Sequence, residues 1–116
     1  MNLTIPVRRV TSVCRDAEAS LGCYRDMLGF TMMEDQRISG PAIGRMVGLA
    51  DRTMRILHLR SSSGPDGLTG LYSIEEGKPP EVPRPNPGSI KLGQVVVVVY
   101  TDHMDGIEPR IRERRY

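Results

Sequence analysis

The sequence has no tryptophan, one phenylalanine and four tyrosines, so aliphatic and methionine side chains must supply most of its core. Its two cysteines, Cys14 and Cys23, form no C-x-x-C pair, and it contains neither a Gly-rich phosphate loop nor a G-x-S-x-G nucleophile elbow. The net charge of +2 is too small to indicate a nucleic-acid partner, and the basic run Arg110–Arg115 is typical of a solvated helix face. The absence of a signal-like segment and of a membrane-length apolar run predicts a reduced, cytoplasmic protein with no membrane partner.

The best-formed local element is the stretch from Asp16 to Phe30, which predicts a helix. Asp16 is a capping residue at its start, Glu18 places negative charge where the helix dipole is positive, and Gly29 ends it. Residues at helical spacing form an apolar stripe that we expect to face a core: Ala17, Leu21, Tyr24 and Leu28. The polar side, which we expect to face water, carries Glu18, Arg25 and Asp26.

Four segments predict strands: Leu3–Arg15, Phe30–Arg37, Thr53–Arg60 and Leu68–Glu76. Apolar and polar residues alternate in the first and third segments, the second has an acidic middle, and the fourth is expected to return as the hairpin partner of the third. In the first segment, one face carries Ile5, Val7, Arg9, Thr11 and Val13. The other face, which includes Val10 and Cys14, is expected to lie under the helix. The Gly-rich segment Ser39–Arg52 predicts a loop, and Ser61–Gly67 predicts a turn between two paired strands.

A proline-rich segment separates this part of the chain from a shorter one. Gly77–Gly93 contains five prolines and predicts an extended linker. Gln94–Tyr100 is a β-branched run that predicts a strand buried on both faces. A helix is expected after it, capped by Asp102 or Asp105; a late start near Asp105 would place Pro109 in its first turn. We therefore expect residues 1–76, 77–93 and 94–116 to be a first module, a linker and the start of a second module within one structural domain.

The helix carries the motif by which the chain resembles a known superfamily. Asp16, Ser20, Leu21, Tyr24 and the sequence Leu28-Gly29-Phe30 match the D-x-x-x-S-L-x-F-Y-x-x-x-L-G-F signature of vicinal oxygen chelate proteins, with Cys23 in place of the usual phenylalanine. This superfamily contains glyoxalases, extradiol dioxygenases and bleomycin resistance proteins. The resemblance implies an α+β fold: a βαβββ module with its helix on the convex side of a cupped sheet, followed here by an incomplete second module (βα). It also implies a small-molecule cavity and a homodimer.

The resemblance also places the candidate site. The superfamily's metal-ligand positions fall at Arg9, His58 and Gln94, and a fourth would lie beyond Tyr116. An arginine cannot ligate a cation, so His58 and Gln94 remain as candidate ligands of a divalent metal, fewer than the three protein ligands of a typical catalytic zinc site. The residues expected to contact the substrate are Arg9, Thr11, Met54, Ile56 and Val96.

Several of these residues have two interpretations. Arg9 is either a structural arginine paired with Glu34 or another acid, or the anchor for a carboxylate or phosphonate ligand. His58 is either a hydrogen-bonded residue of the cavity wall, or a ligand or general base. His103 is expected to be solvated near a helix end, Cys14 to be an unreactive core residue and Cys23 to pack.

Two functional hypotheses follow from the resemblance. In the first, the protein is an enzyme of the glyoxalase or dioxygenase type, a lyase or dioxygenase that acts on a substrate with vicinal oxygens. In the second, it is a metal-free binding protein, similar to bleomycin resistance proteins, that holds a small anionic or aromatic compound in a cavity between subunits, with Arg9 fixing the charge of the compound. The ligand positions favour the second hypothesis.

Overall fold

We describe the protein from a computed structural model, which covers residues 3, 6–48, 52–61, 64–83, 88–90 and 92–114. The chain divides into two compact units, Met1–Pro79 and Pro80–Tyr116, which we describe separately. The boundary between them falls within the predicted linker. No helix in the described ranges is long and apolar enough to cross a membrane.

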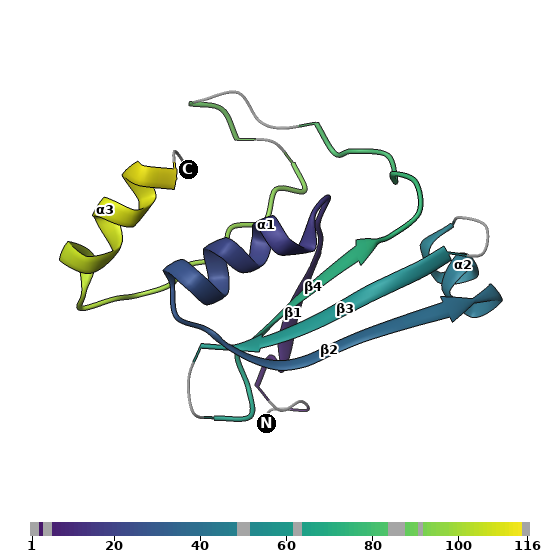
Figure 1. The fold of residues 1–116 in the computed structure, drawn as a ribbon, viewed down its shortest axis with the longest axis horizontal. Helices are drawn as coiled ribbons and strands as arrows, with labels where there is room; N and C mark the ends of the chain where they lie inside the picture. Colours follow the sequence, from purple (N-terminus) through teal and green to yellow (C-terminus); the bar gives the residue numbers. More distant parts are fainter. Residues whose placement is uncertain are drawn as a thin grey trace. The chain divides into compact units, whose positions relative to one another are not determined.

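The first unit is a four-stranded mixed sheet with helices, which confirms the predicted α+β class and βαβββ order. Its elements are β1 (Arg9–Val13), α1 (Ala17–Leu21), the π-helix η1 (Gly22–Met27), β2 (Thr31–Gly40), α2 (Pro41–Val47), β3 (Arg52–Arg60) and β4 (Leu68–Ile74). The strands lie in the order β1-β4-β3-β2 (Figure 1). β1 runs parallel to β4, and the other two pairs are antiparallel.

The predicted helix forms as α1 followed directly by η1. The Asp16 carboxylate accepts hydrogen bonds from the backbone N–H groups of Glu18 and Ala19, at 2.9 and 3.3 Å, so it caps the helix as expected. Gly29 ends the helix with φ +78°, a conformation that glycine adopts without a steric penalty. The apolar stripe packs on one face of the sheet, in a buried cluster formed by Ala17, Leu21, Phe30, Leu57, Leu59 and Leu71.

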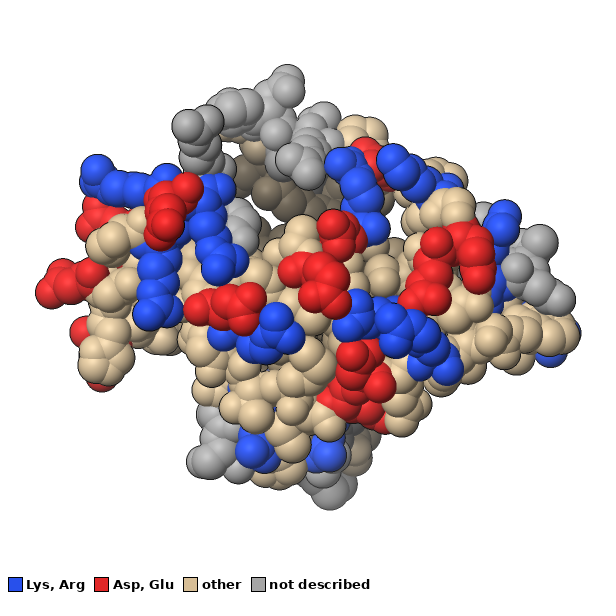
Figure 2. All heavy atoms as spheres, viewed as in Figure 1, with Lys and Arg blue, Asp and Glu red and all other residues tan. Residues whose placement is uncertain are grey.

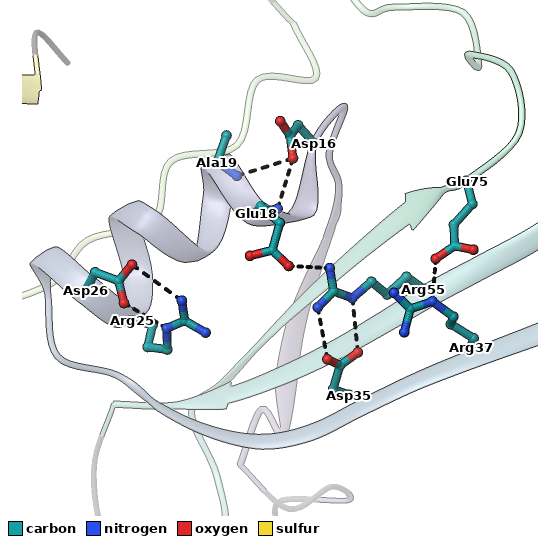
Figure 3. A network of polar contacts seen from close by, with 9 residues as sticks. All are labelled: Asp16, Glu18, Ala19, Arg25, Asp26, Asp35, Arg37, Arg55 and Glu75. Carbon is teal, nitrogen blue, oxygen red and sulfur yellow. Dashed lines mark hydrogen bonds and ion pairs between the residues drawn. The ribbon is translucent and has the colours of Figure 1, made fainter.

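Charged side chains also join α1 to this face of the sheet. The Arg55 guanidinium on β3 donates to Glu18 Oε1 at 2.7 Å and to both carboxylate oxygens of Asp35 on β2, at 3.0 and 2.9 Å (Figure 3). Glu18 thus stays largely exposed, as predicted, while it also bonds to the sheet. On the face drawn in Figure 2, acidic and basic side chains lie interspersed over much of the surface.

The opposite face of the sheet is covered at one end by α2. Ile43 of α2 packs with Met54, Ile56 and Ile74 in a second buried cluster. The predicted loop over Ser39–Arg52 is therefore wrong for residues 41–47, while residues 49–51 lie outside the described ranges. A helix forms there because Pro41 occupies its first turn and Gly48 ends it with a left-handed φ of +72°.

β1 and β2 differ in length from their predictions. β1 begins at Arg9, not Leu3, although Cys14 extends its pairing by donating from its backbone N–H to the Tyr72 carbonyl at 2.8 Å. Ile5, predicted on the Arg9 face, lies outside the described residues. β2 continues to Gly40, three residues past the predicted end, and pairs with β3 along its length.

In the second unit, residues 94–100 form no strand. Val95–Val99 expose 43 to 75% of their surface, so the predicted burial on both faces is wrong. A β-branched run favours extended backbone, but a strand also needs a neighbouring strand to bond its N–H and C=O groups. None is paired with this segment in the described part of the chain.

The helix α3 (Met104–Arg114) forms within one residue of the predicted start at Asp105. The His103 carbonyl accepts from the N–H groups of Gly106 and Ile107, so the helix begins after His103 and Asp102 lies outside it. Pro109 lies inside the helix and not in its first turn, contrary to the prediction. Arg110–Arg114 are largely exposed, as expected of a solvated helix face, and Arg115 is outside the described residues.

Candidate functional site

The candidate site lies on the sheet face that carries α2, beyond the end that this helix covers. Along β3, Met54 and Ile56 lie under α2, whereas His58 and Arg60 continue the same face without that cover. The strand register places Thr11, Gly70, His58 and Glu34 in one row across β1, β4, β3 and β2. Polar side chains from β1, β3 and β2 therefore meet around Gly70 of β4 at this end of the sheet.

Gly70 provides the space in which Arg9 and Thr11 lie. A Cβ atom at Gly70 would be 2.5 Å from Thr11 Oγ1, closer than such atoms approach in proteins, and 3.1 Å from Arg9 Cδ, a tight contact that would require Arg9 to shift slightly. Arg9 thus crosses β4 where there is no side chain, and its Nη1 comes within 3.4 Å of His58 Nδ1 on β3. Its Nε donates to Thr11 Oγ1 at 3.2 Å, which fixes the base of the guanidinium.

His58 pairs with Glu34 on the neighbouring strand. His58 Nδ1 is 2.6 Å from Glu34 Oε2, a much shorter contact than the one to Arg9. A ring nitrogen cannot donate to a carboxylate and also accept from a guanidinium, so the shorter contact decides that Nδ1 carries the proton. The contact to Arg9 is then not a hydrogen bond, and Arg9 Nη1 keeps its donor capacity.

The pairing with Glu34 leaves the second ring nitrogen of His58 without a partner. His58 Nε2 is buried and has no hydrogen-bond partner among the residues that the structure describes. With the proton on Nδ1, Nε2 carries the lone pair and is able to accept a proton. The Glu34 carboxylate is held in turn by the Gln36 side-chain amide, which donates to Glu34 Oε1.

A cavity of about 710 Å³ opens at this end of the sheet. Its lining combines arginines, the His58–Glu34 pair and a few apolar residues: Arg8, Arg9, Met33, Glu34, Gln36, His58, Arg60, Gly64, Pro65 and Leu68. Arg8 lies 3.7 Å from the Asp66 carboxylate, and Glu34 is paired with His58. Arg9 and Arg60 have no carboxylate partner in the described part of the chain, so the lining carries an excess of positive charge.

The residues predicted to contact the substrate lie in three different places. Arg9 lines the cavity and Thr11 supports it. Met54 and Ile56 are on the same face but are buried beneath α2 and do not line this cavity. Val96 is an exposed residue of the second unit. Of the two interpretations of Arg9, a pairing with Glu34 is not formed, because Glu34 pairs with His58.

Four residues of the site were absent from the predicted set of contacts: Gly70, Glu34, Gln36 and Arg60. Glu34 was considered only as a partner for Arg9. The alternation of β3 already places Arg60 on the face of His58, so its position could have been found from the sequence. The importance of Gly70 depends on the pairing of β4 with both β1 and β3, which no local pattern specifies.

The described residues do not fit a catalytic divalent metal. No group of three His, Cys, Asp or Glu side chains suited to hold an ion occurs in residues 6–48, 52–61, 64–83 and 92–114. His58 would supply one nitrogen, but the permanently charged Arg9 guanidinium lies beside its ring. Gln94 belongs to the second unit and not to this sheet.

The remaining titratable candidates have structural surroundings. Cys14 packs against the α1 cluster, and burial raises the pKa of its thiol, which disfavours the nucleophilic thiolate. Cys23 is half-buried in η1. His103 is exposed, and its backbone N–H bonds to Thr101 Oγ1 at 3.0 Å next to the start of α3. These positions agree with the core, packing and solvated roles expected of them.

Comparison with known proteins supports the fold. No protein-family model matches the sequence, and neither does any curated protein. Among solved structures, a glyoxalase family protein from Bacillus cereus is similar, with a TM-score of 0.68 over 97% of this chain and 74% of that chain. The two sequences are 14% identical, so the similarity is one of fold. The chain thus has a glyoxalase-like fold, as its helix motif predicted.

Proposed function

We propose that the protein binds a small anionic molecule in the cavity, with Arg9 as the anchor for its negative charge. The observation that carries this proposal is the Arg9 guanidinium, which lines the cavity without a carboxylate partner in the described residues. A guanidinium without a carboxylate partner favours an anion, because it donates charge-assisted, parallel hydrogen bonds to the oxygens of a carboxylate or phosphonate. The glyoxalase-like fold is consistent with a small-molecule site.

The geometry around Arg9 supports recognition of a planar or tetrahedral oxyanion. Nε is used by Thr11, while the N–H groups of Nη1 and Nη2 have no acceptor among the described side chains once His58 Nδ1 carries a proton. Two such parallel donors match the two oxygens of a carboxylate or phosphonate. Gly70 leaves space for the Arg9 side chain, and Thr11 bonds to its Nε. The guanidinium is therefore ordered before a ligand binds, which lowers the entropic cost of binding.

We expect Arg9→Gln to weaken the binding of small carboxylates and phosphonates by about tenfold or more, since a charge-assisted hydrogen bond contributes about 1.5–3 kcal/mol. Titration calorimetry with benzoate and methylphosphonate measures this loss. Arg8→Gln is the matched control, because Arg8 lines the same cavity but is already near Asp66. Unchanged affinity of the Arg9 variant for both anions would contradict the proposal.

A second candidate, a lyase-type proton transfer, is favoured by the unpartnered Nε2 of His58. Glu34 holds Nδ1–H, so Nε2 carries the lone pair that a general base needs, and because this atom is buried, the ring or its neighbours must move before a ligand reaches it. An anion held by Arg9 would lie near this ring, because Arg9 Nη1 and His58 Nδ1 are 3.4 Å apart. In this proposal His58 accepts a proton from the carbon next to the ligand's carboxylate. A dioxygenase would need a metal-ligand set that the described residues do not supply.

Proton transfer predicts that the wild-type protein exchanges the α-hydrogen of a bound carboxylate with deuterium from solvent. We expect His58→Gln to abolish this exchange and to leave carboxylate affinity within about threefold, because Arg9 holds the charge. Proton NMR of a set of short carboxylates in D2O follows the exchange, and calorimetry follows affinity. If no carboxylate that binds shows exchange above the rate in buffer, the lyase candidate is wrong and the binding proposal stands. The homodimer and the cytoplasmic location stay predictions.

A further inference from the structure

We infer that the ligand is a dianion, a short molecule with an acidic group at each end, and that Arg60 binds the second group. This inference rests on the proposed function of Arg9 and extends it to the class of ligand. It assigns a role to a residue outside the predicted site. Three features carry it: the register that places Arg60 in the same row as Arg9, the charge of the cavity, and the apolar Leu68 side chain between the two arginines.

The register places both arginines in one row. Arg9 of β1 is paired with Leu68 of β4, and Leu68 is paired with Arg60 of β3. Paired residues of neighbouring strands point to the same face of a sheet, so Arg9 and Arg60 are on the same face with Leu68 between them. Both arginines and Leu68 line the cavity.

The Arg9 guanidinium lies outside the row that its backbone shares with Arg60. Arg9 leans along the sheet over Gly70, so that its head is beside His58. Arg60 is two residues further along β3 than His58, a separation of about 6.6 Å in a strand. A single compact anion seated on Arg9 would thus leave Arg60 with its charge uncompensated.

The charges of the cavity lining call for more than one negative group. Arg8 is near Asp66 and His58 is paired with Glu34. Arg9 and Arg60 remain without a carboxylate partner in the described ranges, and two like charges in one cavity raise each other's electrostatic energy. A ligand with two acidic groups relieves this repulsion, whereas a monoanion neutralises only one of the pair.

The residue between the two arginines is apolar and suits a hydrocarbon linker. Leu68 of β4 separates Arg9 from Arg60 in the row and lines the cavity with them. A short methylene chain would contact the Leu68 side chain, and its burial would add to the affinity. Dicarboxylates with a few methylene groups combine both features, while inorganic phosphate has the charge without the linker.

Calorimetric titration of the wild-type protein and three variants with glutarate and valerate tests the inference. These acids have the same number of carbons, and only glutarate has a second carboxylate. We expect wild type to bind glutarate at least tenfold more tightly than valerate. We expect Arg60→Gln to remove that preference without changing the affinity for valerate, and Arg9→Gln to weaken both. Arg45→Gln, an exposed arginine that does not line the cavity, is the control and should change neither.

The outcomes separate this inference from the function on which it rests. Equal binding of the two acids, dependent on Arg9, would overturn the dianion and leave the anion site intact. A preference for glutarate that survives in Arg60→Gln would overturn the role of Arg60. Phosphate binding as tightly as glutarate would show that the linker contributes nothing, against the inference. If none of these anions binds to wild type, both proposals fail.

Discussion

Gly70→Ala is expected to lower both the stability of the protein and its affinity for anions, although the change adds a single methyl group. The new Cβ would lie 2.5 Å from Thr11 Oγ1 and 3.1 Å from Arg9 Cδ, so both side chains must move. Overpacking of this kind costs about 1–3 kcal/mol in the free energy of unfolding. Because displaced Arg9 loses its position over β4, anion affinity should fall by about tenfold or more. Urea unfolding and calorimetry measure the two effects.

Gly64→Ala is the matched control for this prediction. Gly64 lines the same cavity, yet a Cβ there would meet no atom within 4 Å. Gly64→Ala should change the free energy of unfolding and the free energy of anion binding by no more than about 0.5 kcal/mol each. A second substitution, Thr11→Ala in the Gly70→Ala background, removes the closest clash and should restore part of the stability. If Gly70→Ala binds anions as wild type does, then Gly70 does not position Arg9.

The contrast between the helix and the space at Gly70 shows which features can be predicted from the sequence. The helix from Asp16 to Gly29 is specified by neighbours in sequence: a cap, an apolar stripe and a glycine end, all within fifteen residues. The faces of β3 follow from alternation alone, which is why His58 was placed on the correct side. Gly70 looks like an ordinary strand residue until β1 and β3 are paired with β4.

Two predictions are wrong because amino-acid composition alone does not specify structure. The glycines of Ser39–Arg52 favour a loop, although Pro41 and Gly48 are placed as the start and end signals of a short helix. The valines of residues 95–99 favour an extended chain, but no pattern within them supplies the neighbouring strand that a sheet requires. Propensity therefore predicted backbone shape in that segment and not pairing or burial.

The pairing of Glu34 with His58 rather than Arg9 also depended on register. Glu34 and His58 fall in two predicted strands, Phe30–Arg37 and Thr53–Arg60, but no local pattern pairs these strands, and a β-bulge between Met32 and Glu34 shifts the alternation of β2 by one residue. Without that shift Glu34 would point to the α1 face. The extra residue in β2 thus brings Glu34 to the face of His58. The pairing with Glu34 orients the His58 ring and leaves Nε2 without a partner among the described residues.

Arg55→Met is expected to give the largest loss of stability of any arginine substitution in the first unit outside the cavity. The Arg55 side chain is 13% exposed and bonds to Glu18 of α1 and Asp35 of β2, so it joins three elements (Figure 3). Methionine keeps much of the apolar stem and removes every one of these charge-assisted bonds. We expect a cost of about 2–3 kcal/mol in the free energy of unfolding, measured by urea denaturation at neutral pH.

Arg37→Met is the control, since Arg37 pairs with Glu75 at the surface of the same sheet and should contribute about 1 kcal/mol or less. The two variants should also differ in their dependence on pH. Hydrogen bonding from Arg55 lowers the pKa of Asp35 below its ordinary value of 3.8. The stabilisation is therefore complete above that value and is lost as the pH falls through the lower, folded-state pKa. The difference between wild type and Arg55→Met should shrink below about pH 4. A difference that stays constant down to pH 2 would mean that Arg55 stabilises the protein by packing and not through its carboxylate partners.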